Sequence, residues 1–335
     1  MAGNLKEVFN TMKPKNRWMF IIACLALSLL FCVPLASAQK YPEKPITIYC
    51  AFAADTTDLT TRALAGGAEK ILGQPVVVEN KPGGGSSVCA GLIASKKPDG
   101  YTLAVISTGA LRILPHTMKV SYDPLKDFTL IMQYSQYIGG LTVLSESPIK
   151  TVDDFIAYAK AHPGLSYGSA GMNTQQYFAV ELFAQCKGLK FKHVPYKSGA
   201  ESSTALLGKH IDFAAGSGTH LRYVKQGVFR ELMVYNTTKR NPNFPNVPML
   251  TELGCQDFPA NGLVFVGPKG IPQPIVKKVG EALKKVSESA DFQNTLANAD
   301  MPYDFKDQAQ LEKEIPQQYE SAKEMLAKMG VKKPQ

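Results

Sequence analysis

Short apolar runs alternate with amphipathic stretches along the chain from about residue 46 onward. The runs at residues 46–52, 76–80 and 101–106 are rich in β-branched and aromatic side chains, which is typical of buried strands. Residues 58–72 and 86–95 lie between these runs and carry apolar side chains at helical spacing. Strands separated by helices of this length predict parallel βαβ units and therefore an α/β fold.

The same alternation starts again further along the chain. Residues 127–145 form a longer mixed stretch that can cross from one lobe to another. Thr151 is expected to cap a helix that runs to about residue 161, with Asp154 three residues on. Later elements are expected as strands at residues 166–168, 191–194, 211–215 and 263–266, and as helices at residues 175–187 and 202–207 and from near residues 273, 291 and 308.

Two βαβ sets joined by more than one crossover predict a hinged, two-lobed receptor. We expect lobe 1 to comprise residues 39–139 with residues 261–335, and lobe 2 to comprise residues 140–260. A chain of 335 residues is long for a single core and natural for two lobes.

The beginning of the chain predicts export. A positive start at Lys13, Lys15 and Arg17 precedes an apolar run over residues 18–35 and then the small-residue sequence of residues 36–38. These three parts make up a secretory signal peptide, so we expect residues 1–38 to be cleaved and the protein to be periplasmic. An uncleaved anchor is the alternative, and a lipoprotein built on Cys24 or Cys32 is another.

Composition narrows the function classes. Of the net charge of +9, +3 lies within residues 1–38, and the remaining +6 is spread along the chain and mildly favours anionic ligands. The chain has no stripe of basic residues with interleaved aromatics, so nucleic-acid binding is not expected. No stretch of eighteen apolar residues follows the leading segment, so no later membrane span is expected.

Four cysteines follow the leading segment, at Cys50, Cys89, Cys186 and Cys255. An oxidising compartment permits disulfides, and four cysteines allow three pairings. A Cys50–Cys89 disulfide is geometrically conceivable, and four buried free thiols are the alternative. Without a Cys-x-x-Cys motif or a histidine cluster, a metal site is not expected.

Loops that follow strands are where ligands bind in open α/β sheets. In the first such loop, Thr57 or Asp58 can cap the next helix and leave free N–H groups for a ligand, although plain capping is the alternative. The loop at residues 107–112 offers small hydroxyl residues, and Arg112 there could grip a carboxylate unless it lies on the surface.

The second lobe offers comparable loops. In residues 168–174, Ser169 and Thr174 can donate hydroxyl groups beside a helix start that favours anions. Residues 216–219 can line the same cleft. The glycines at residues 83–85 fit neither a Walker loop nor a dinucleotide fingerprint, so no cofactor is expected.

Catalytic groupings are poor by comparison. The five histidines are scattered, and no Gly-x-Ser-x-Gly elbow presents a nucleophile. Asp55 and Asp58 share one loop, whereas paired catalytic carboxylates usually come from different elements. An enzyme is therefore not expected.

Several segments in register resemble the receptor family of tripartite tricarboxylate transporters, also called the Bug or TctC-like family. The resemblance covers essentially the whole chain after the leading segment. It is carried by Tyr41-Pro42, Lys44-Pro45-Ile46, the run from Gly73 through Glu79-Asn80-Lys81-Pro82 to Gly85, Pro98-Asp99-Gly100-Tyr101-Thr102-Leu103, Tyr122-Asp123-Pro124, Asp127-Phe128, Gly168-Ser169-Ala170-Gly171, His193-Val194-Pro195-Tyr196-Lys197 and Gly267-Pro268.

The resemblance implies a venus-flytrap-like periplasmic-binding-protein fold, in which each lobe is a mixed sheet flanked by helices. It implies a receptor that captures a small carboxylate, such as a di- or tricarboxylate, for a secondary transporter with one large and one small integral-membrane subunit. The alternative is a ligand-dependent sensor or orphan binding protein for an aromatic carboxylate or an amino acid. We expect a monomer.

The resemblance also implies a set of ligand contacts. By position these are Phe52, Ala53, Ala54, Asp55, Thr56, Thr57, Thr108, Gly109, Ala110, Ser169, Ala170 and Thr174. The loops themselves add Arg112, Gly216 and Ser217.

Three positions depart from the family pattern. Asp55 stands where the family usually has glycine, and an inward-pointing Asp55 would repel a carboxylate unless the ligand also carries an amine or hydroxyl group. No acidic residue occurs near Ala215 or Gly216, which predicts a less acidic far end of the pocket. Arg112, at a position where a small residue is commoner, would suit a second carboxylate.

Overall fold

A computed structural model of the chain describes residues 41–53, 56–172, 174–237, 240 and 244–331. The predicted signal peptide, residues 1–38, lies outside the described residues. Pro42–Gln335 forms one compact unit, and this unit contains two β-sheets. We call each sheet with its helices a lobe.

The first lobe is built on a six-stranded sheet with the order β11-β4-β10-β3-β1-β2. Its strands are β1 (Ile46–Cys50), β2 (Val76–Asn80), β3 (Thr102–Ser107), β4 (Phe128–Tyr137), β10 (Asn261–Pro268) and β11 (Tyr303–Lys306). Strand β1 pairs in parallel with β2 and β3, whereas β10 runs antiparallel to β3 and β4. The sheet is therefore mixed, as predicted.

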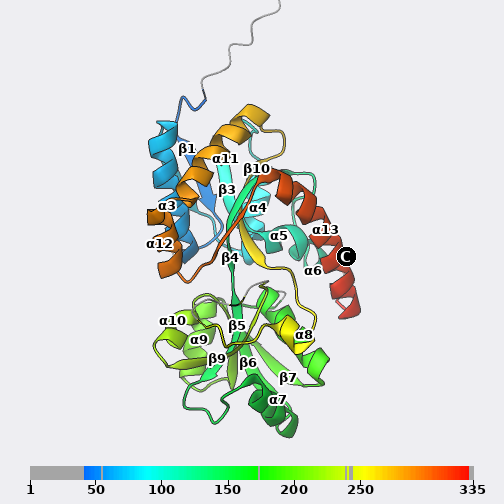
Figure 1. Cartoon of the computed structure of the whole chain (residues 1–335). Coiled ribbons are helices and arrows are strands. Elements are labelled where there is room, and N and C mark those ends of the chain that lie inside the picture. Colours follow the sequence, from blue (N-terminus) through cyan, green and yellow to red (C-terminus); the bar gives the residue numbers. More distant parts are fainter. Residues whose placement is uncertain (1–40, 54–55, 173, 238–239, 241–243, 332–335) are drawn as a thin grey trace, which may run out of the picture. The chain divides into compact units, whose positions relative to one another are not determined.

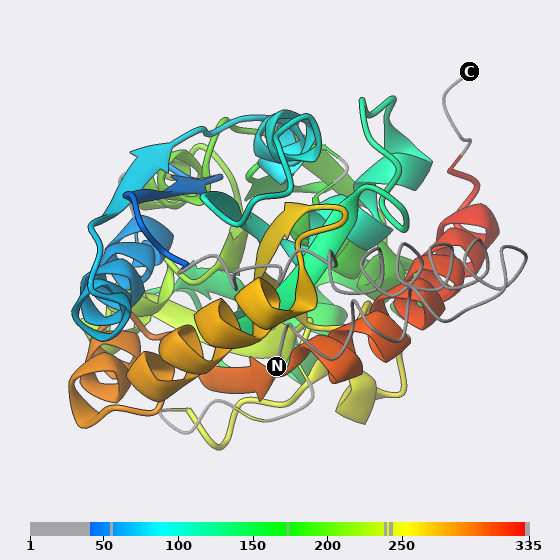
Figure 2. The same ribbon diagram turned by 90° about the horizontal axis from the view of Figure 1, so that it is seen from above.

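Helices cover both faces of this sheet (Figure 1). One face carries α3 (Thr56–Leu72), α11 (Gln273–Ser287) and α12 (Ala290–Asn298). The other carries α4 (Ser87–Ala94), α5 (Thr108–Arg112), α6 (Leu114–Thr117) and α13 (Gln308–Lys328), with the short turn η1 (Gly84–Ser86) before α4. In the view of Figure 2, α12 (orange) again lies beside α3 (blue).

Close packing fixes these helices on the sheet. Ile106 and Val264 of the central strands belong to one buried apolar cluster with Ile93 of α4 and Leu311 of α13. On the opposite face, α3 and α11 approach closely at Gly67, where a Cβ atom would lie 2.4 Å from a methyl carbon of the Val286 side chain. A larger residue at this glycine would push the two helices apart.

The second lobe is built on a five-stranded sheet with the order β7-β6-β8-β5-β9. Its strands are β5 (Gly139–Leu144), β6 (Leu165–Ser169), β7 (Phe191–Pro195), β8 (Phe213–Ser217) and β9 (Phe229–Tyr235). Its helices are α7 (Val152–Ala161), α8 (Gln175–Lys187), α9 (Gly199–Leu207), α10 (Leu221–Lys225) and the 3₁₀ turn η2 (Leu250–Leu253). Helices α7 and α8 pack through Phe155 and Phe183 against Phe213 of β8.

Most predicted elements are present, with shifts of a few residues at their ends. Thr151 caps α7 and forms a reciprocal capping box with Asp154, which confirms that prediction. The prediction omitted β9, β11, α5, α6 and α10. The mixed stretch at residues 127–145 contains β4 and β5, which belong to different sheets. The proposed residue limits of the two lobes stay a prediction.

The cysteine predictions are wrong. Cys186 and Cys255 form a disulfide with a Cα–Cα distance of 5.7 Å, whereas Cys50 and Cys89 are buried thiols that are not in a disulfide. Side chains alternate between the two faces of a strand. Cys50 contacts Thr61 of α3 on one face, while Cys89 belongs to α4 on the other. The sheet therefore separates the two thiols that the sequence suggested as a pair.

Candidate ligand-binding site

The first two predicted loops leave neighbouring strands. Strands β1 and β3 are parallel partners, with Cys50 opposite Val105, so the loops that follow them lie side by side. In the first loop Phe52 is half-buried and Ala53 is exposed. Ala54 and Asp55 lie outside the described residues, so the expectation about the direction of the Asp55 side chain stays untested.

The first loop is shaped by its own polar groups. Helix α3 already includes Thr57 and Asp58, so the prediction that one of them caps it is wrong. The Asp58 carboxylate accepts hydrogen bonds from Arg62 Nε at 2.9 Å and from Asn80 Nδ2 at 2.7 Å. Asn80 also donates to the carbonyl of Phe52 at 2.9 Å. These bonds tie the loop after β1 to the end of β2.

Tyr137 joins this loop to the end of β4. Its hydroxyl is hydrogen-bonded to Thr57 Oγ1, and its ring meets Phe52 edge-on with 6.1 Å between ring centroids. The β-carbon position of Gly218, in the loop after β8, would lie 3.7 Å from the Tyr137 ring. Residues of both lobes therefore meet at Tyr137, which the sequence analysis missed.

The loop after β3 turns directly into α5. Ser107 caps this helix by accepting a hydrogen bond from Gly109 N at 3.0 Å. The Asn261 side-chain oxygen accepts a second bond from Gly109 N at 3.2 Å, and Thr108 Oγ1 accepts one from Gly262 N at 2.9 Å. The polar groups of this loop thus bind the start of β10, where the chain returns from the second lobe.

Arg112 lies inside the protein. Its side chain is fully buried, so the alternative of a surface arginine is wrong. Nη2 donates to the carbonyls of Pro259 and Ala260 at 2.9 and 2.6 Å, and Nη1 donates to Gln318 Oε1 at 2.9 Å. Burial lowers the pKa of Arg112 to about 9, so the guanidinium stays protonated at neutral pH. Both Nη atoms thus bind protein acceptors, and Nε is buried without a hydrogen-bond partner among the described residues. The full burial of the side chain argues against a role in gripping a second carboxylate.

The hydroxyl groups of the loop after β6 are also hydrogen-bonded within the protein. Thr174 caps α8 and donates to the Gly171 carbonyl at 2.9 Å. Ser169 Oγ donates to the same carbonyl at 3.0 Å and lies 2.8 Å from His193 Nε2. Burial lowers the pKa of His193, which favours the neutral imidazole. Ala170 is half-buried.

The predicted contacts therefore differ in their access to solvent. The half-buried or exposed ones are Phe52, Ala53, Thr56, Ala170 and Thr174. The buried ones are Thr57, Thr108, Gly109, Ala110, Arg112, Ser169 and Gly216. Ser217 ends β8 opposite Gly139. Buried hydroxyls that already have partners can position a ligand loop, whereas backbone groups and half-buried residues remain for direct contact.

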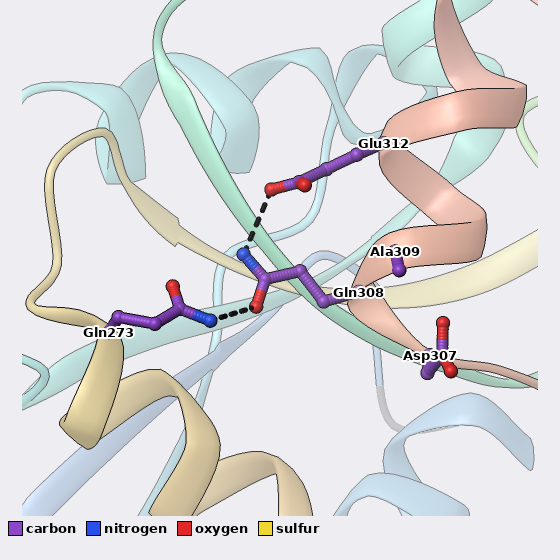
Figure 3. Close-up of a pocket in the computed structure, with 5 residues that line it drawn as sticks. All are labelled: Gln273, Asp307, Gln308, Ala309 and Glu312. Carbon is purple, nitrogen blue, oxygen red and sulfur yellow. Dashed lines mark hydrogen bonds between the residues drawn. The ribbon is translucent and has the colours of Figure 1, made fainter.

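A pocket of about 510 Å³ lies elsewhere, in the first lobe. It is lined by Gln273, Asp307, Gln308, Ala309 and Glu312, at the starts of α11 and α13. Figure 3 shows Gln273 donating to Gln308, which in turn donates to Glu312. None of the predicted ligand contacts lines this pocket, and its two amide NH₂ groups already donate to Gln308 and Glu312.

The described residues hold no cluster of three or more histidine, cysteine or acidic side chains that could bind a metal ion. Among the helices that can be described, none is both long and apolar enough to cross a bilayer. The site thus consists of hydroxyls, backbone groups and aromatic rings. Such groups can hold and orient a polar solute.

Comparison with known proteins gives consistent relatives. The profile of a family described as "Tripartite tricarboxylate transporter family receptor" matches residues 60–331. A UPF0065 protein in the gbd 5′ region of Cupriavidus necator is 40% identical over 315 residues, which cover 93% of this chain and 96% of that protein. Protein BugT of Bordetella pertussis is 29% identical over 261 residues, covering 74% and 79% of the two chains.

Solved structures agree with these relatives. The periplasmic binding protein BugD superposes with a TM-score of 0.77 at 26% identity, covering 88% of this chain and all of BugD. A periplasmic transporter structure gives a TM-score of 0.78, also at 26% identity, covering 87% of this chain and 99% of that one. The predicted two-lobed α/β fold is therefore confirmed.

Proposed function

Because the chain belongs to the receptor family of tripartite tricarboxylate transporters, we propose that it captures a small organic acid outside the cytoplasm for a transporter of that type. The family consists of solute-binding receptors, so the protein is a receptor and not an enzyme. Two structures that share its fold at 23% identity contain adipate and malate, respectively. These ligands guide the choice of compounds to test.

The convergence at Tyr137 is the observation that supports this proposal most strongly. Phe52 and Thr57 come from the first lobe, and Gly218 comes from the second. A ligand placed here would contact both sheets, and such contact favours a closed arrangement of two hinged lobes. We propose Phe52, Ala53, Ala54, Asp55, Thr56, Ala170, Thr174, Gly216 and Ser217 as ligand contacts, with Thr57, Thr108, Gly109, Ala110 and Ser169 holding the loops.

Membership of this family also supports a proposal for the location and partners of the protein. We propose that residues 1–38 are a cleaved signal peptide and that the receptor is a periplasmic monomer. One large and one small integral-membrane subunit would receive the ligand. Mass spectrometry of the exported protein tests the first point, because cleavage predicts a mature chain that begins at Gln39.

A thermal-shift screen of the mature protein tests the function. Ligands that bind only the folded state raise the melting temperature by mass action. We expect one or more carboxylates from a set of mono-, di- and tricarboxylates and amino acids to raise it, and neutral sugars and amides of similar size to leave it unchanged. A response to neutral solutes alone would contradict the proposal.

Tyr137→Phe then tests the location of the site. This substitution removes the hydroxyl that binds Thr57 and keeps the ring beside Phe52. We expect the ligand found in the screen to bind roughly tenfold more weakly, because Thr57 loses this hydrogen bond in the first turn of α3. Tyr303→Phe, on the edge strand β11, is the matched control, with unchanged affinity.

A further inference from the structure

Two ionisable side chains are buried against each other in the second lobe, and none of the contacts above uses them. His220 directly precedes α10 and Glu231 belongs to β9. His220 Nε2 lies 2.7 Å from Glu231 Oε1, and neither side chain has exposed surface. Burying such a pair costs desolvation energy that a pair of apolar side chains would avoid. A contribution to stability therefore does not explain why His220 and Glu231 are buried together.

Glycines on two neighbouring strands make room for this pair. Gly140 of β5 lies opposite Gly216 of β8. A Cβ atom on Gly140 would lie 1.8 Å from Glu231 Oε1, and one on Gly216 would lie 2.2 Å from His220 Nδ1. A larger residue at either position would therefore displace Glu231 or His220. The sheet is thus built around the pair.

The hydrogen bonds identify the tautomer of His220. The backbone N–H of Gly218 donates to His220 Nδ1 at 3.2 Å, so Nδ1 carries no proton. The proton therefore sits on Nε2 and is donated to Glu231 Oε1. His220 is neutral in this arrangement. Glu231 Oε2 is buried and has no hydrogen-bond partner among the described residues.

This pair acts on a loop of the proposed ligand site. Gly218 lies beside Tyr137, where the two lobes meet. Its N–H is used by His220, so this amide cannot also bind a ligand carboxylate. Behind it lies the carboxyl group of Glu231, hydrogen-bonded to the neutral imidazole. The sequence analysis predicted no acidic residue at the far end of the site, because it took only β8 into account. Glu231 comes from the neighbouring region of the lobe, on β9.

We propose that His220 and Glu231 are positioning residues that fix residues 216–219 and make this side of the site disfavour a second carboxylate. This inference rests on the proposed function and narrows it. The preferred ligands are monocarboxylates whose far end carries a hydroxyl or ammonium group. A dicarboxylate of the same length binds more weakly, because its second charge faces Glu231.

Calorimetric titration with matched compounds tests the selectivity. The four-carbon set is succinate, 4-hydroxybutanoate and 4-aminobutanoate, and the six-carbon set is adipate, 6-hydroxyhexanoate and 6-aminohexanoate. For the better-binding length, we expect the hydroxy or amino acid to bind at least about tenfold more tightly than the diacid, as one unit charge several ångströms away in a partly buried site would cause. A wild-type preference for the diacid would overturn the inference without any variant.

Glu231→Gln removes the charge and keeps the shape and an acceptor for His220. We expect this variant to reduce the preference about tenfold, chiefly by strengthening diacid binding. Glu181→Gln is the control, because Glu181 accepts a hydrogen bond from Tyr167 at 2.8 Å in the same lobe but does not contact residues 216–219 in any described interaction. An equal change for all ligands in Glu231→Gln would overturn the inference and leave the proposed function intact.

Nuclear magnetic resonance tests the positioning without any ligand. We expect the ¹⁵N shifts of wild-type His220 to report the Nε2–H tautomer and the Gly218 amide to exchange slowly. His220→Leu should speed that exchange by at least about tenfold, because the N–H loses its acceptor. A proton on Nδ1, or an unprotected Gly218 amide in the wild type, would overturn the positioning role. Failure of every carboxylate to bind would overturn the proposed function and the selectivity together.

Discussion

Buried polar side chains stabilise the segments where the chain passes between the two sheets. Arg112 is among the largest side chains that are fully buried. Its guanidinium binds the carbonyls of Pro259 and Ala260 just before β10, and it also binds Gln318 of α13. Carbonyls buried without donors are costly, so this residue stabilises the returning crossover. Arg112 therefore contributes to the stability of the fold.

Replacing Arg112 therefore tests stability first. Arg112→Met keeps much of the apolar volume and removes the guanidinium donors to the carbonyls of Pro259 and Ala260, of which Pro259 keeps a bond from Gln175 Nε2. We expect the free energy of unfolding to fall by about 3 kcal/mol, measured by urea denaturation. Lys313→Ala, at an exposed position of α13, should change it by less than about 0.5 kcal/mol. If the Arg112→Met protein were as stable as the wild type and had lost only its binding of dicarboxylates, Arg112 would bind the second carboxylate after all.

At the scale of elements, the segment between η2 and β10 is held from two sides. The Cys186–Cys255 disulfide joins the end of α8 to this segment across a sequence separation of 69 residues. Two residues further on, Asp257 accepts hydrogen bonds from the backbone of Asn236 and of Phe258. The helix whose first turn borders the proposed site is thereby anchored at its other end.

Removing the disulfide should destabilise the protein without abolishing its fold. Closing a loop of this length limits the entropy of the unfolded chain by the equivalent of about 4 kcal/mol in the chain-entropy treatment. We expect dithiothreitol to lower the free energy of unfolding of the wild type by a few kcal/mol. A Cys186→Ala, Cys255→Ala double variant should start lower and show no further response. An equal response of both proteins to dithiothreitol would contradict the assignment of this bond.

Asp257 gives the crossover a pH dependence. Burial raises the pKa of this carboxyl to about 7, against hydrogen bonds from Asn236 and Phe258 that lower it. In the unfolded chain the group titrates near 4. Between these two values the folded state holds a proton that the unfolded state has lost, so stability falls as pH rises from about 4 to about 7 and is level above that.

Urea denaturation between pH 4.5 and 8 measures this effect. We expect Asp257 to contribute on the order of 2 kcal/mol to the fall, less than its full pKa shift implies because the side chain is partly exposed. Asp257→Asn should remove this part of the slope. Parallel pH profiles for the variant and the wild type would show that the carboxyl is ionised throughout.

At the scale of the whole molecule, an apolar cluster joins elements of both lobes. Phe178 and Leu182 of α8 pack with Ile113, with Phe258 of the crossover, and with Ala322 and Leu326 of α13. Lys225 at the end of α10 also forms an ion pair with Asp300, between α12 and β11. Helix α13 thus packs on the sheet of the first lobe and also contacts α8 of the second lobe.

The sequence predicted most of the fold because hydrophobic periodicity and helix caps are local signals. Thr151 with Asp154 is one such signal. Strand β9 was missed because Arg230 and Glu231 interrupt its apolar pattern, although both point to partners within the lobe. The sequence predicted which loops form the site, but it did not predict the hydrogen bonds that their side chains make. Thr108 and Arg112 form their hydrogen bonds with segments that lie about 150 residues further along the chain. Local sequence patterns cannot show that these groups are already bonded.

The central claim is that this receptor recognises a carboxylate through charge. Calorimetric titration of the mature protein with the best carboxylate from the screen and with its primary amide tests this most directly. We expect one binding site per chain and an amide at least about a hundredfold weaker, because charge-assisted hydrogen bonds to the carboxylate are lost. Equal affinities for the acid and the amide would contradict the claim.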